Sequence, residues 1–244
     1  MYDFGVWCSA PMRAGTRYDH LCMRVAFFGG TFDPPHCGHL AIARVAAQRL
    51  HLDKVLFAPV GRQPLKQGSS IASFEDRLAM VKLAIAGDPG LEVSTADAPR
   101  ANEKPNYTID TLVRLKKTLP PEDHFFCLIG ADSFLTMRHW HRAADLLFVC
   151  DFIVAGRPGF DLQQAAEALP AGTQIIGKPR VTPGVAILEA GNSHGRRSTL
   201  YLLSDLQEDV SATEIREAFA EGATGERVLA APVADYIREH KLYR

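Results

Sequence analysis

The sequence predicts an α/β fold built on a doubly wound parallel sheet with C-terminal helices. Residues 24–28 (RVAFF) form an apolar run that ends at a glycine pair, which is typical of a buried strand. Residues 40–52 follow with helical periodicity, and residues 54–58 (KVLFA) predict a second strand that ends at Pro59. Strand, helix and strand in so short a unit form a βαβ crossover, and such crossovers build Rossmann-like parallel sheets.

The same alternation continues along the chain. Further strands are expected at residues 91–95, 124–129, 151–155, 185–188 and 199–203, and further helices at 73–86, 108–119, 161–169, 211–221 and 233–241. Residues 191–198 (GNSHGRRS) are polar without a period and predict a surface loop. Sheets of this class bind ligands beyond the carboxyl ends of their strands, so we expect the functional site there.

Composition places the chain among folded, enzyme-sized proteins. Its 244 residues are 47% hydrophobic and 23% charged, which is far from the profile of a disordered chain. The formal net charge of -1 offers no broad attraction to nucleic acid or to an anionic membrane, so any anion must be held by a local site. The five cysteines are scattered and predict reduced thiols in a cytoplasmic protein. A homo-oligomer stays open.

Residues 1–22 stand apart from the rest of the chain. They contain arginines but no continuous apolar segment, so they do not resemble a signal peptide. No apolar stretch in the chain approaches the ~20 residues of a membrane span. Because Met23 lies directly before the first strand, we expect either a disordered leader or a true start at Met23. A single domain is then expected over residues 23–244.

The segment between the first strand and the first helix carries the chemistry. Residues 28–40 read FGGTFDPPHCGHL. Gly29 and Gly30 allow a sharp turn and a close approach of a ligand to backbone N–H groups. The segment leads into a helix N-terminus, where unpaired N–H groups and the helix dipole favour an anion. His36 and His39 are three positions apart, so both rings can face one side of the first turn, which suits a phosphate.

Two other interpretations of this segment stay open. A metal site would need more ligands nearby, whereas Cys37 would point elsewhere on a helix, and no Cys-x-x-Cys or His-Glu-x-x-His motif accompanies it. A purely structural role would have His36 as a cap and His39 packed in the core. The dinucleotide-binding and P-loop fingerprints are both missing from the sequence. Phosphate binding is the interpretation that the βαβ context favours.

The segment also resembles the signature of a known family. GGTFDPPHCGH is similar to the motif of the HxGH nucleotidyltransferases, and its Thr-Phe-Asp-Pro-Pro form resembles the nicotinate-nucleotide adenylyltransferase family. Further similar segments follow in order within residues 23–244: PNYTIDTL (105–112), IGADSF (129–134) with Trp140, VAGRPG (154–159) and VSATEIR (210–216). The resemblance implies an HxGH-type fold and a reaction in NAD biosynthesis. In that reaction the adenylyl group of ATP passes to nicotinate mononucleotide, giving nicotinate adenine dinucleotide and pyrophosphate, with Mg²⁺ carried by the nucleotide.

The resemblance implies roles for individual residues on the ATP side. The catalytic residues would be His36, His39, Lys66 and Arg216, and the ATP- and phosphate-binding residues Gly29, Gly30, Thr31, Phe32, Gly38, Gly130, Asp132, Arg157, Ser211 and Thr213. Ordinary alternatives exist: Ser211 and Thr213 suit helix capping, and Lys66 and Arg216 suit a solvated surface. Asp33 fits either a role in the loop turn or a role in ordering Mg²⁺.

On the pyridine side the resemblance implies Thr108, Trp140 and His141. Trp140 would stack on the electron-poor nicotinate ring, and its ordinary alternative is a partly buried core aromatic. Relatives often have tyrosine at the position of His141, which bears on discrimination between the acid and the amide. Leu65 and Ala212 also depart from the family pattern, where histidine and serine are usual.

Two other functions stay open. One is another HxGH transferase, which would act on phosphopantetheine or use a cytidylyl donor; the pyridine-side segments around Thr108 and Trp140 argue against it. The other is a non-catalytic nucleotide-binding module on the same fold, against which the joint presence of the four catalytic candidates argues. The expected partners are ATP and nicotinate mononucleotide, with neither nucleic acid nor membrane.

Overall fold

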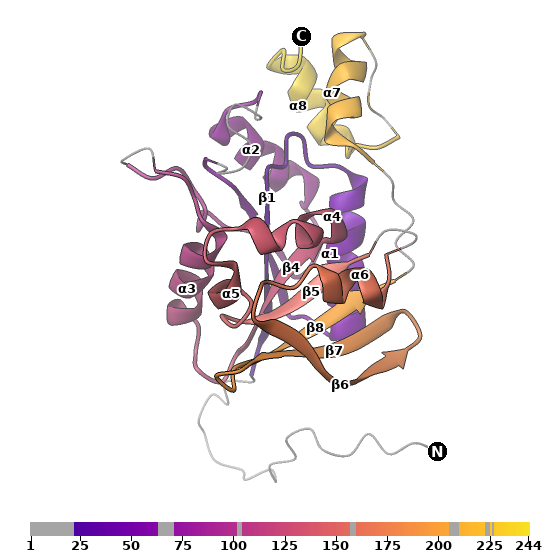
Figure 1. Ribbon diagram of the computed structural model, residues 1–244. Helices are drawn as coiled ribbons and strands as arrows, with labels where there is room; N and C mark the ends of the chain where they lie inside the picture. Colours follow the sequence, from indigo (N-terminus) through magenta and orange to yellow (C-terminus); the bar gives the residue numbers. More distant parts are fainter. Residues whose placement is uncertain are drawn as a thin grey trace, which may run out of the picture.

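The computed structural model describes residues 22–62, 71–101, 104–156, 160–204, 210–222, 225 and 227–244. Over these residues the chain forms an eight-stranded sheet in the order β3-β2-β1-β4-β5-β8-β7-β6 (Figure 1). All neighbours from β3 to β8 pair in parallel, while β7 pairs antiparallel with both β8 and β6. The predicted α/β sheet is therefore confirmed, and an antiparallel edge is added to it.

The strands and helices that the sequence predicts lie close to their expected ranges, and β6, α4, η1 and α5 are additional. The strands are β1 (Arg24–Gly30), β2 (Lys54–Pro59), β3 (Leu91–Val93), β4 (His124–Gly130), β5 (Asp151–Ala155), β6 (Thr173–Thr182), β7 (Val185–Asn192) and β8 (Arg197–Leu203). The helices are α1 (Cys37–Leu50), α2 (Phe74–Ala84), α3 (Thr108–Thr118), α4 (Ala131–Leu135), the 3-10 turn η1 (Met137–His139), α5 (Ala143–Leu146), α6 (Leu162–Glu167), α7 (Ala212–Ala220) and α8 (Ala231–Glu239).

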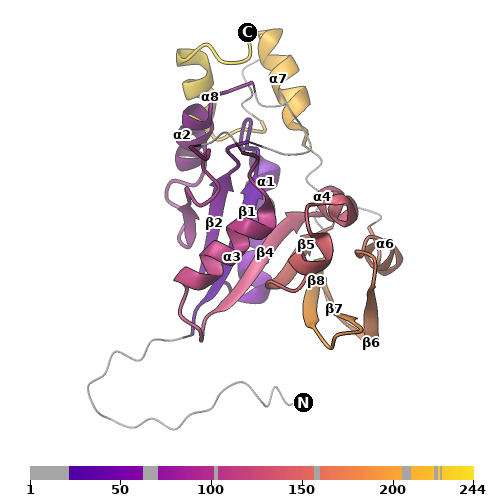
Figure 2. The ribbon, with the colours of Figure 1, turned by 60° about the vertical axis from the view of Figure 1, so that its left-hand side comes forward.

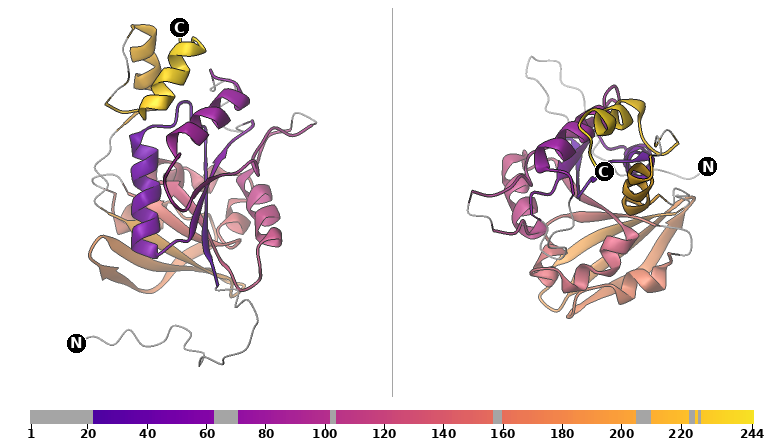
Figure 3. Two further views of the ribbon diagram at one scale, coloured as in Figure 1. Left: turned by 180° about the vertical axis from the view of Figure 1, so that it is seen from behind. Right: turned by 90° about the horizontal axis from the view of Figure 1, so that it is seen from above.

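The core consists of two layers, one on each face of the sheet. Successive side chains of a strand point to opposite faces. Ala26 and Phe28 accordingly join the layer that includes residues of α1, α2, α7 and α8, whereas Val25 and Phe27 join the layer of α3, α4, α5 and α6. Figure 3 (left) shows α1 and α2 in front of the sheet, and Figure 2 shows α3 on the other side. The sheet is doubly wound, as predicted.

Two features of the C-terminal part of the sheet differ from the prediction. Strand β6 was not expected, because most of its residues are exposed and it carries Gly177 and Pro179 where its pairing with β7 shifts. Residues 191–198 are not a loop: β7 runs to Asn192 and β8 starts at Arg197. Only a short turn remains, held by Asn192 Oδ1, which accepts from the backbone N–H groups of residues 194 and 196.

Helices α7 and α8 lie at the carboxyl end of the sheet (Figure 2). Val233 and Ile237 of α8 are buried in the layer that also contains Met80 and Val81 of α2. The C-terminal helices thus pack beside the predicted site. In the parts of the chain that the structure covers, every helix is too short or too polar to span a bilayer.

Candidate active site

The β1–α1 segment brings its two histidines together. His36 is the N-cap of α1, with extended backbone (φ -135°, ψ 173°), and His39 is the third residue of the helix. The His36 backbone N–H donates to His39 Nδ1 at 3.2 Å, and the two ring centroids lie 3.8 Å apart. The prediction that both imidazoles share one side of the first turn is confirmed.

This hydrogen bond also determines which nitrogen of His39 can donate. Because Nδ1 accepts from the backbone, the proton of the neutral ring resides on Nε2. Burial, and then the neighbouring His36, lower the pKa of His39 well below its ordinary value. The edge of the ring also packs against Phe32, with centroids 4.9 Å apart. His39 is therefore a neutral, oriented N–H donor at the start of α1.

Close packing requires a glycine at position 30. A Cβ on Gly30 would lie 2.9 Å from the ring of Phe32, which is 1% exposed. Phe32 itself has φ 51°, a conformation that few non-glycine residues adopt. A side chain at position 30 would push this ring away from His39. Gly38, in the first turn of α1, is buried.

A buried arginine binds the backbone of the β1–α1 segment. Arg77 of α2 is 1% exposed, and its Nη1 donates to the Thr31 carbonyl at 2.7 Å while its Nη2 donates to the Val60 carbonyl at 2.8 Å. It therefore joins the end of β1 to the end of β2. Sequence reasoning did not find Arg77, because a single arginine within a helical pattern ordinarily indicates an exposed face.

Asp33 holds the turn before α1. Its carboxylate is 2% exposed and accepts from the backbone N–H of Ile71 (2.7 Å), the backbone N–H of Ala72 (3.3 Å) and the hydroxyl of Tyr243 (2.6 Å). Of the two roles left open for Asp33, these contacts support the structural one. Among the described residues, no group of three or more His, Cys, Asp or Glu side chains could hold a metal ion.

Helix α7 brings a cation to the same segment. Arg216 Nη1 donates to the Asp33 carbonyl at 2.8 Å, and its Nη2 donates to Thr213 Oγ1 at 3.0 Å. Ser211 is the N-cap of α7, and its carbonyl accepts from the Ile215 N–H at 3.1 Å. The sequence motif around residues 210–216 therefore reaches the histidine segment across most of the chain length.

The predicted catalytic residue Lys66 and the predicted ATP-binding residue Arg157 lie outside the described residues. Gly130 is the last residue of β4 and the N-cap of α4, and a Cβ there would meet nothing within 4 Å. Asp132 is exposed in the first turn of α4. Both lie at the carboxyl end of the sheet, where the fold predicts ligand binding.

The pyridine-side candidates form a second group. Thr108 is the first residue of α3, and the ring of the preceding Tyr107 stacks on His141 with centroids 4.1 Å apart and planes inclined by 28°. Trp140 is half-buried, and its Nε1 donates to Thr136 Oγ1 at 3.3 Å. The Tyr107–His141 stack thus joins the start of α3 to the segment that follows η1.

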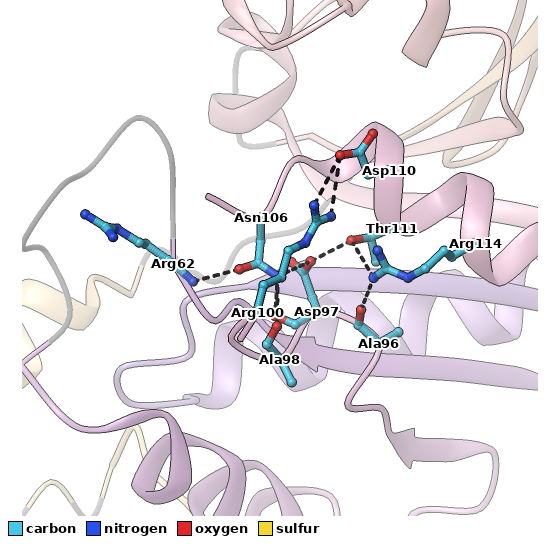
Figure 4. A network of polar contacts seen from close by, with 9 residues as sticks. All are labelled: Arg62, Ala96, Asp97, Ala98, Arg100, Asn106, Asp110, Thr111 and Arg114. Atoms are coloured by element: carbon cyan, nitrogen blue, oxygen red, sulfur yellow. Dashed lines mark hydrogen bonds and ion pairs between the residues drawn. The ribbon is translucent and has the colours of Figure 1, made fainter. Parts of the chain in front are cut away.

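A buried polar network holds the start of α3 (Figure 4). Asn106 exchanges hydrogen bonds with the backbone of Arg62: its Oδ1 accepts at 3.1 Å and its N–H donates at 2.9 Å. Its Nδ2 donates to the carbonyls of Asp97 (3.1 Å) and Ala98 (2.9 Å). Thr111 Oγ1 donates to the Asp97 carboxylate at 2.7 Å. In the sequence, Asn106 stands out only as part of the PNYTIDTL motif, which does not indicate this structural role.

A hollow at the opposite end of the strands is separate from the candidate active site. It measures about 330 Å³, and its lining includes Lys116, Asp123, His124, Asp151 and Arg197. Three of these are the first residues of β4, β5 and β8. The hollow therefore lies at the amino ends of the strands, away from the histidine segment.

The chain is similar to proteins of one family. The Cytidylyltransferase-like family model matches residues 27–218. Two relatives named "Probable nicotinate-nucleotide adenylyltransferase" come from Dehalococcoides mccartyi (strain CBDB1) and Gloeobacter violaceus. The first is 35% identical over 91% of this chain and 98% of the relative, and the second 39% identical over 90% and 96%.

Solved structures share the fold. A Plasmodium falciparum nicotinic acid mononucleotide adenylyltransferase complexed with NaAD matches with a TM-score of 0.66 at 15% identity, covering 91% of this chain and 97% of that chain. The same enzyme complexed with APC matches with a TM-score of 0.65 at 16% identity, with the same coverage. The sequence relatives, together with the site geometry, decide the family. This chain belongs to the nicotinate-nucleotide adenylyltransferase family, within the Cytidylyltransferase-like group.

Proposed function

We propose that this protein transfers the adenylyl group of ATP to nicotinate mononucleotide, giving nicotinate adenine dinucleotide and pyrophosphate in NAD biosynthesis. The observation that carries the proposal is that Arg216 of α7 donates to the carbonyl of Asp33, in the turn that leads to the paired rings of His36 and His39. The aromatic group of Tyr107, Trp140 and His141 adds a surface on which a ring can stack. A donor cluster for phosphates and a stacking surface for a heterocycle are what this pair of substrates requires. The names of the sequence relatives support the same reaction.

The reaction needs no nucleophilic side chain. A phosphate oxygen of nicotinate mononucleotide forms a bond to the α-phosphorus of ATP, and the bond from that phosphorus to the bridging oxygen of pyrophosphate breaks. The protein brings two anions into line, and orientation of this kind can supply up to ~7 to 11 kcal/mol. Pyrophosphate leaves with the negative charge that the donors of the site have stabilised.

Each donor has a part in this mechanism. His39 donates its Nε2–H to a phosphate oxygen, and His36 lines the same turn. Arg216, held by Asp33 and Thr213, and the N-terminus of α7 at Ser211 bind the β- and γ-phosphates. The segment of Gly29 to Phe32, with Gly38 and Lys66, completes the phosphate-binding surface. Asp132 and the backbone around Gly130 and Arg157 face the nucleotide sugar and base. Mg²⁺ arrives bound to the phosphates of ATP.

The pyridine side selects the acceptor. Trp140 stacks on the nicotinate ring, and Thr108 and His141 lie near its carboxylate. The Tyr107–His141 stack (4.1 Å) supports this assignment because it joins the α3 segment to the residue beside Trp140. We further propose a cytoplasmic location, which the free, buried thiols of Cys127 and Cys150 support.

The test is pyrophosphate release from ATP and Mg²⁺ with nicotinate mononucleotide, nicotinamide mononucleotide or phosphopantetheine as acceptor. The expected result is release with nicotinate mononucleotide and a large loss in His39→Ala. The matched control is His124→Ala, because His124 is exposed at the amino end of β4 and should leave the rate unchanged. Release with phosphopantetheine alone would overturn the roles of Thr108 and Trp140. ATP binding without release would favour a binding module instead.

A further inference from the structure

The turn after α8 returns to the histidine segment. Tyr243 is 6% exposed, and its hydroxyl donates to Asp33 Oδ1 at 2.6 Å across a sequence separation of 210 residues. Lys241 and Tyr243 both have left-handed backbone, with φ of 54° and 65°. Non-glycine residues seldom adopt this conformation. Here it directs the Tyr243 ring into the protein next to the turn.

Asp33 is the point at which several segments of the candidate site meet. Its carboxylate binds Tyr243 and the backbone N–H groups of Ile71 and Ala72, while its carbonyl accepts from Arg216 Nη1 at 2.8 Å. The hydroxyl of Tyr243 and the guanidinium of Arg216 thus bind opposite ends of one residue. A displacement of Asp33 as a whole would move its carboxylate and its carbonyl together, and with the carbonyl the acceptor of Arg216.

The same C-terminal part of the chain makes a second contact with the turn. The carbonyl of Val228, in the connection from α7 to α8, accepts from the backbone N–H of Cys37 at 2.8 Å. Cys37 is the first residue of α1 and follows His36 directly. The turn from Asp33 to Cys37 is therefore held at both ends by residues that follow α7.

We propose that Tyr243 is a positioning residue for the pyrophosphate-binding groups: through Asp33, its hydroxyl sets the place of Arg216 relative to His36 and His39. This inference rests on the proposed function, because it concerns the phosphates of that reaction. Burial, and then the hydrogen bond to Asp33, raise the pKa of Tyr243 above its ordinary value. The hydroxyl therefore keeps its proton and stays a donor at the pH of the assay.

The chain contains a matched control for this contact. Tyr236 of α8 also donates its hydroxyl to a carboxylate, that of Asp76, at 2.9 Å. Asp76 lies in the first turn of α2, where its carboxylate also accepts from Ser73 Oγ at 2.7 Å. Tyr236→Phe removes the same chemical group from the same part of the chain. It should lower thermal stability without moving any kinetic constant.

The experiment compares Tyr243→Phe and Tyr236→Phe in both directions of the reaction, at a temperature where circular dichroism shows each variant folded. The reverse direction starts from nicotinate adenine dinucleotide and pyrophosphate. Its KM for pyrophosphate shows directly how well the positioned groups bind this substrate. We expect Tyr243→Phe to raise the KM for pyrophosphate and for ATP and to lower kcat, by about 10-fold to 100-fold in kcat/KM. The KM for both pyridine substrates should stay within about twofold.

Asp33→Asn gives a second measurement of the same coupling. It weakens the acceptor and nearly preserves side-chain volume, so it should raise the KM for pyrophosphate as well. The double variant Asp33→Asn with Tyr243→Phe should lose less than the product of the single losses, because both act through one contact. Should Tyr243→Phe fail to fold, Asp33→Asn tests the same acceptor, and a wild-type KM for pyrophosphate in this variant would overturn the positioning role.

The outcomes separate this inference from the proposed function. If the wild type releases no pyrophosphate with nicotinate mononucleotide, the proposed function fails. If the wild type is active and the folded Tyr243→Phe variant has wild-type KM for pyrophosphate and ATP, the positioning role is wrong and the reaction stands. An equal change in Tyr236→Phe would also overturn the positioning role, because it would indicate a general loss of packing.

Discussion

The backbone N–H of His36 donates to Nδ1 of His39 across 3.2 Å, so the first histidine of the motif orients the second. An imidazole whose Nδ1 accepts from the backbone presents Nε2–H outward. A neutral histidine in this tautomer remains a hydrogen-bond donor to an anion. The spacing of the two histidines thus supports the helix start and also fits the proposed contact with phosphate.

Two variants of His39 separate these roles. Asparagine has a polar atom near the place of Nδ1 that can accept from His36, whereas alanine has none. Both variants lose the Nε2–H donor, so both should lower kcat by roughly 10² to 10³. His39→Ala should also lose up to ~1 kcal/mol of unfolding free energy through the missing cap acceptor, and His39→Asn less. Steady-state rates and urea denaturation measure the two effects, and wild-type turnover in either variant would contradict the assigned role.

The lowered pKa of His39 predicts acid sensitivity of the fold. The unfolded chain protonates this histidine near its ordinary pKa of about 6.5, while the folded protein resists protonation. The unfolded state therefore binds more protons below about pH 6.5, and the free energy of unfolding should fall as the pH drops from there toward the folded pKa. Well above that pH, His39 contributes no pH dependence.

Urea denaturation of the wild type and of His39→Asn at several pH values checks this sign. The variant should show a shallower loss of unfolding free energy between about pH 6.5 and pH 5, where an ordinary histidine titrates. Parallel curves for wild type and His39→Asn would show that His39 does not titrate abnormally.

The network under α3 predicts a linked change in stability and substrate affinity. Thr111 is fully buried and donates to Asp97. Burial raises the pKa of Asp97 above its ordinary value, and the hydrogen bonds from Thr111 and Asn106 only partly offset this rise. Thr111→Val preserves shape and removes the hydroxyl, so it should cost ~1 to 3 kcal/mol of unfolding free energy. Because α3 begins at Thr108, the KM for nicotinate mononucleotide should rise more than the KM for ATP.

A threonine on the same helix provides the control. Thr118 is exposed, and its hydroxyl donates to the carbonyl of Leu115. Thr118→Val should change the unfolding free energy by less than ~0.5 kcal/mol and leave both KM values unchanged. If Thr111→Val loses stability but raises both KM values equally, the network supports the fold in general and not the pyridine side.

Trp140 should affect one substrate only. An aromatic stacking contact is worth ~0.5 to 1.5 kcal/mol beyond burial, so Trp140→Ala should raise the KM for nicotinate mononucleotide by roughly 2-fold to 12-fold or more. The KM for ATP should not change. Trp140→Phe keeps a ring, so its KM for nicotinate mononucleotide should lie between those of the wild type and Trp140→Ala. Equal losses for both substrates would indicate that Trp140 acts as a core residue, the ordinary alternative for a half-buried tryptophan.

Local patterns were sufficient for most elements of the fold. The helix expected at 108–119 is Thr108–Thr118, and the strand expected at 124–129 is His124–Gly130. Apolar runs, helical periodicity and capping residues act over a few positions, so the sequence displays them directly. Strand β6 (Thr173–Thr182) fails this rule because it is exposed along much of its length. Its strand conformation depends on pairing with β7, which no local pattern displays.

The sequence by itself determined the βαβ start, the phosphate-binding interpretation of residues 28–40 and the family motifs, because each resides in a short continuous segment. Only the tertiary structure decided what holds those motifs in place. The buried Arg77 donates to the carbonyl of Thr31, 46 positions away, and Tyr243 donates to Asp33, 210 positions away. Burial and pairing over such separations depend on how the whole chain packs, and an arginine or a tyrosine looks the same in sequence whether exposed or buried.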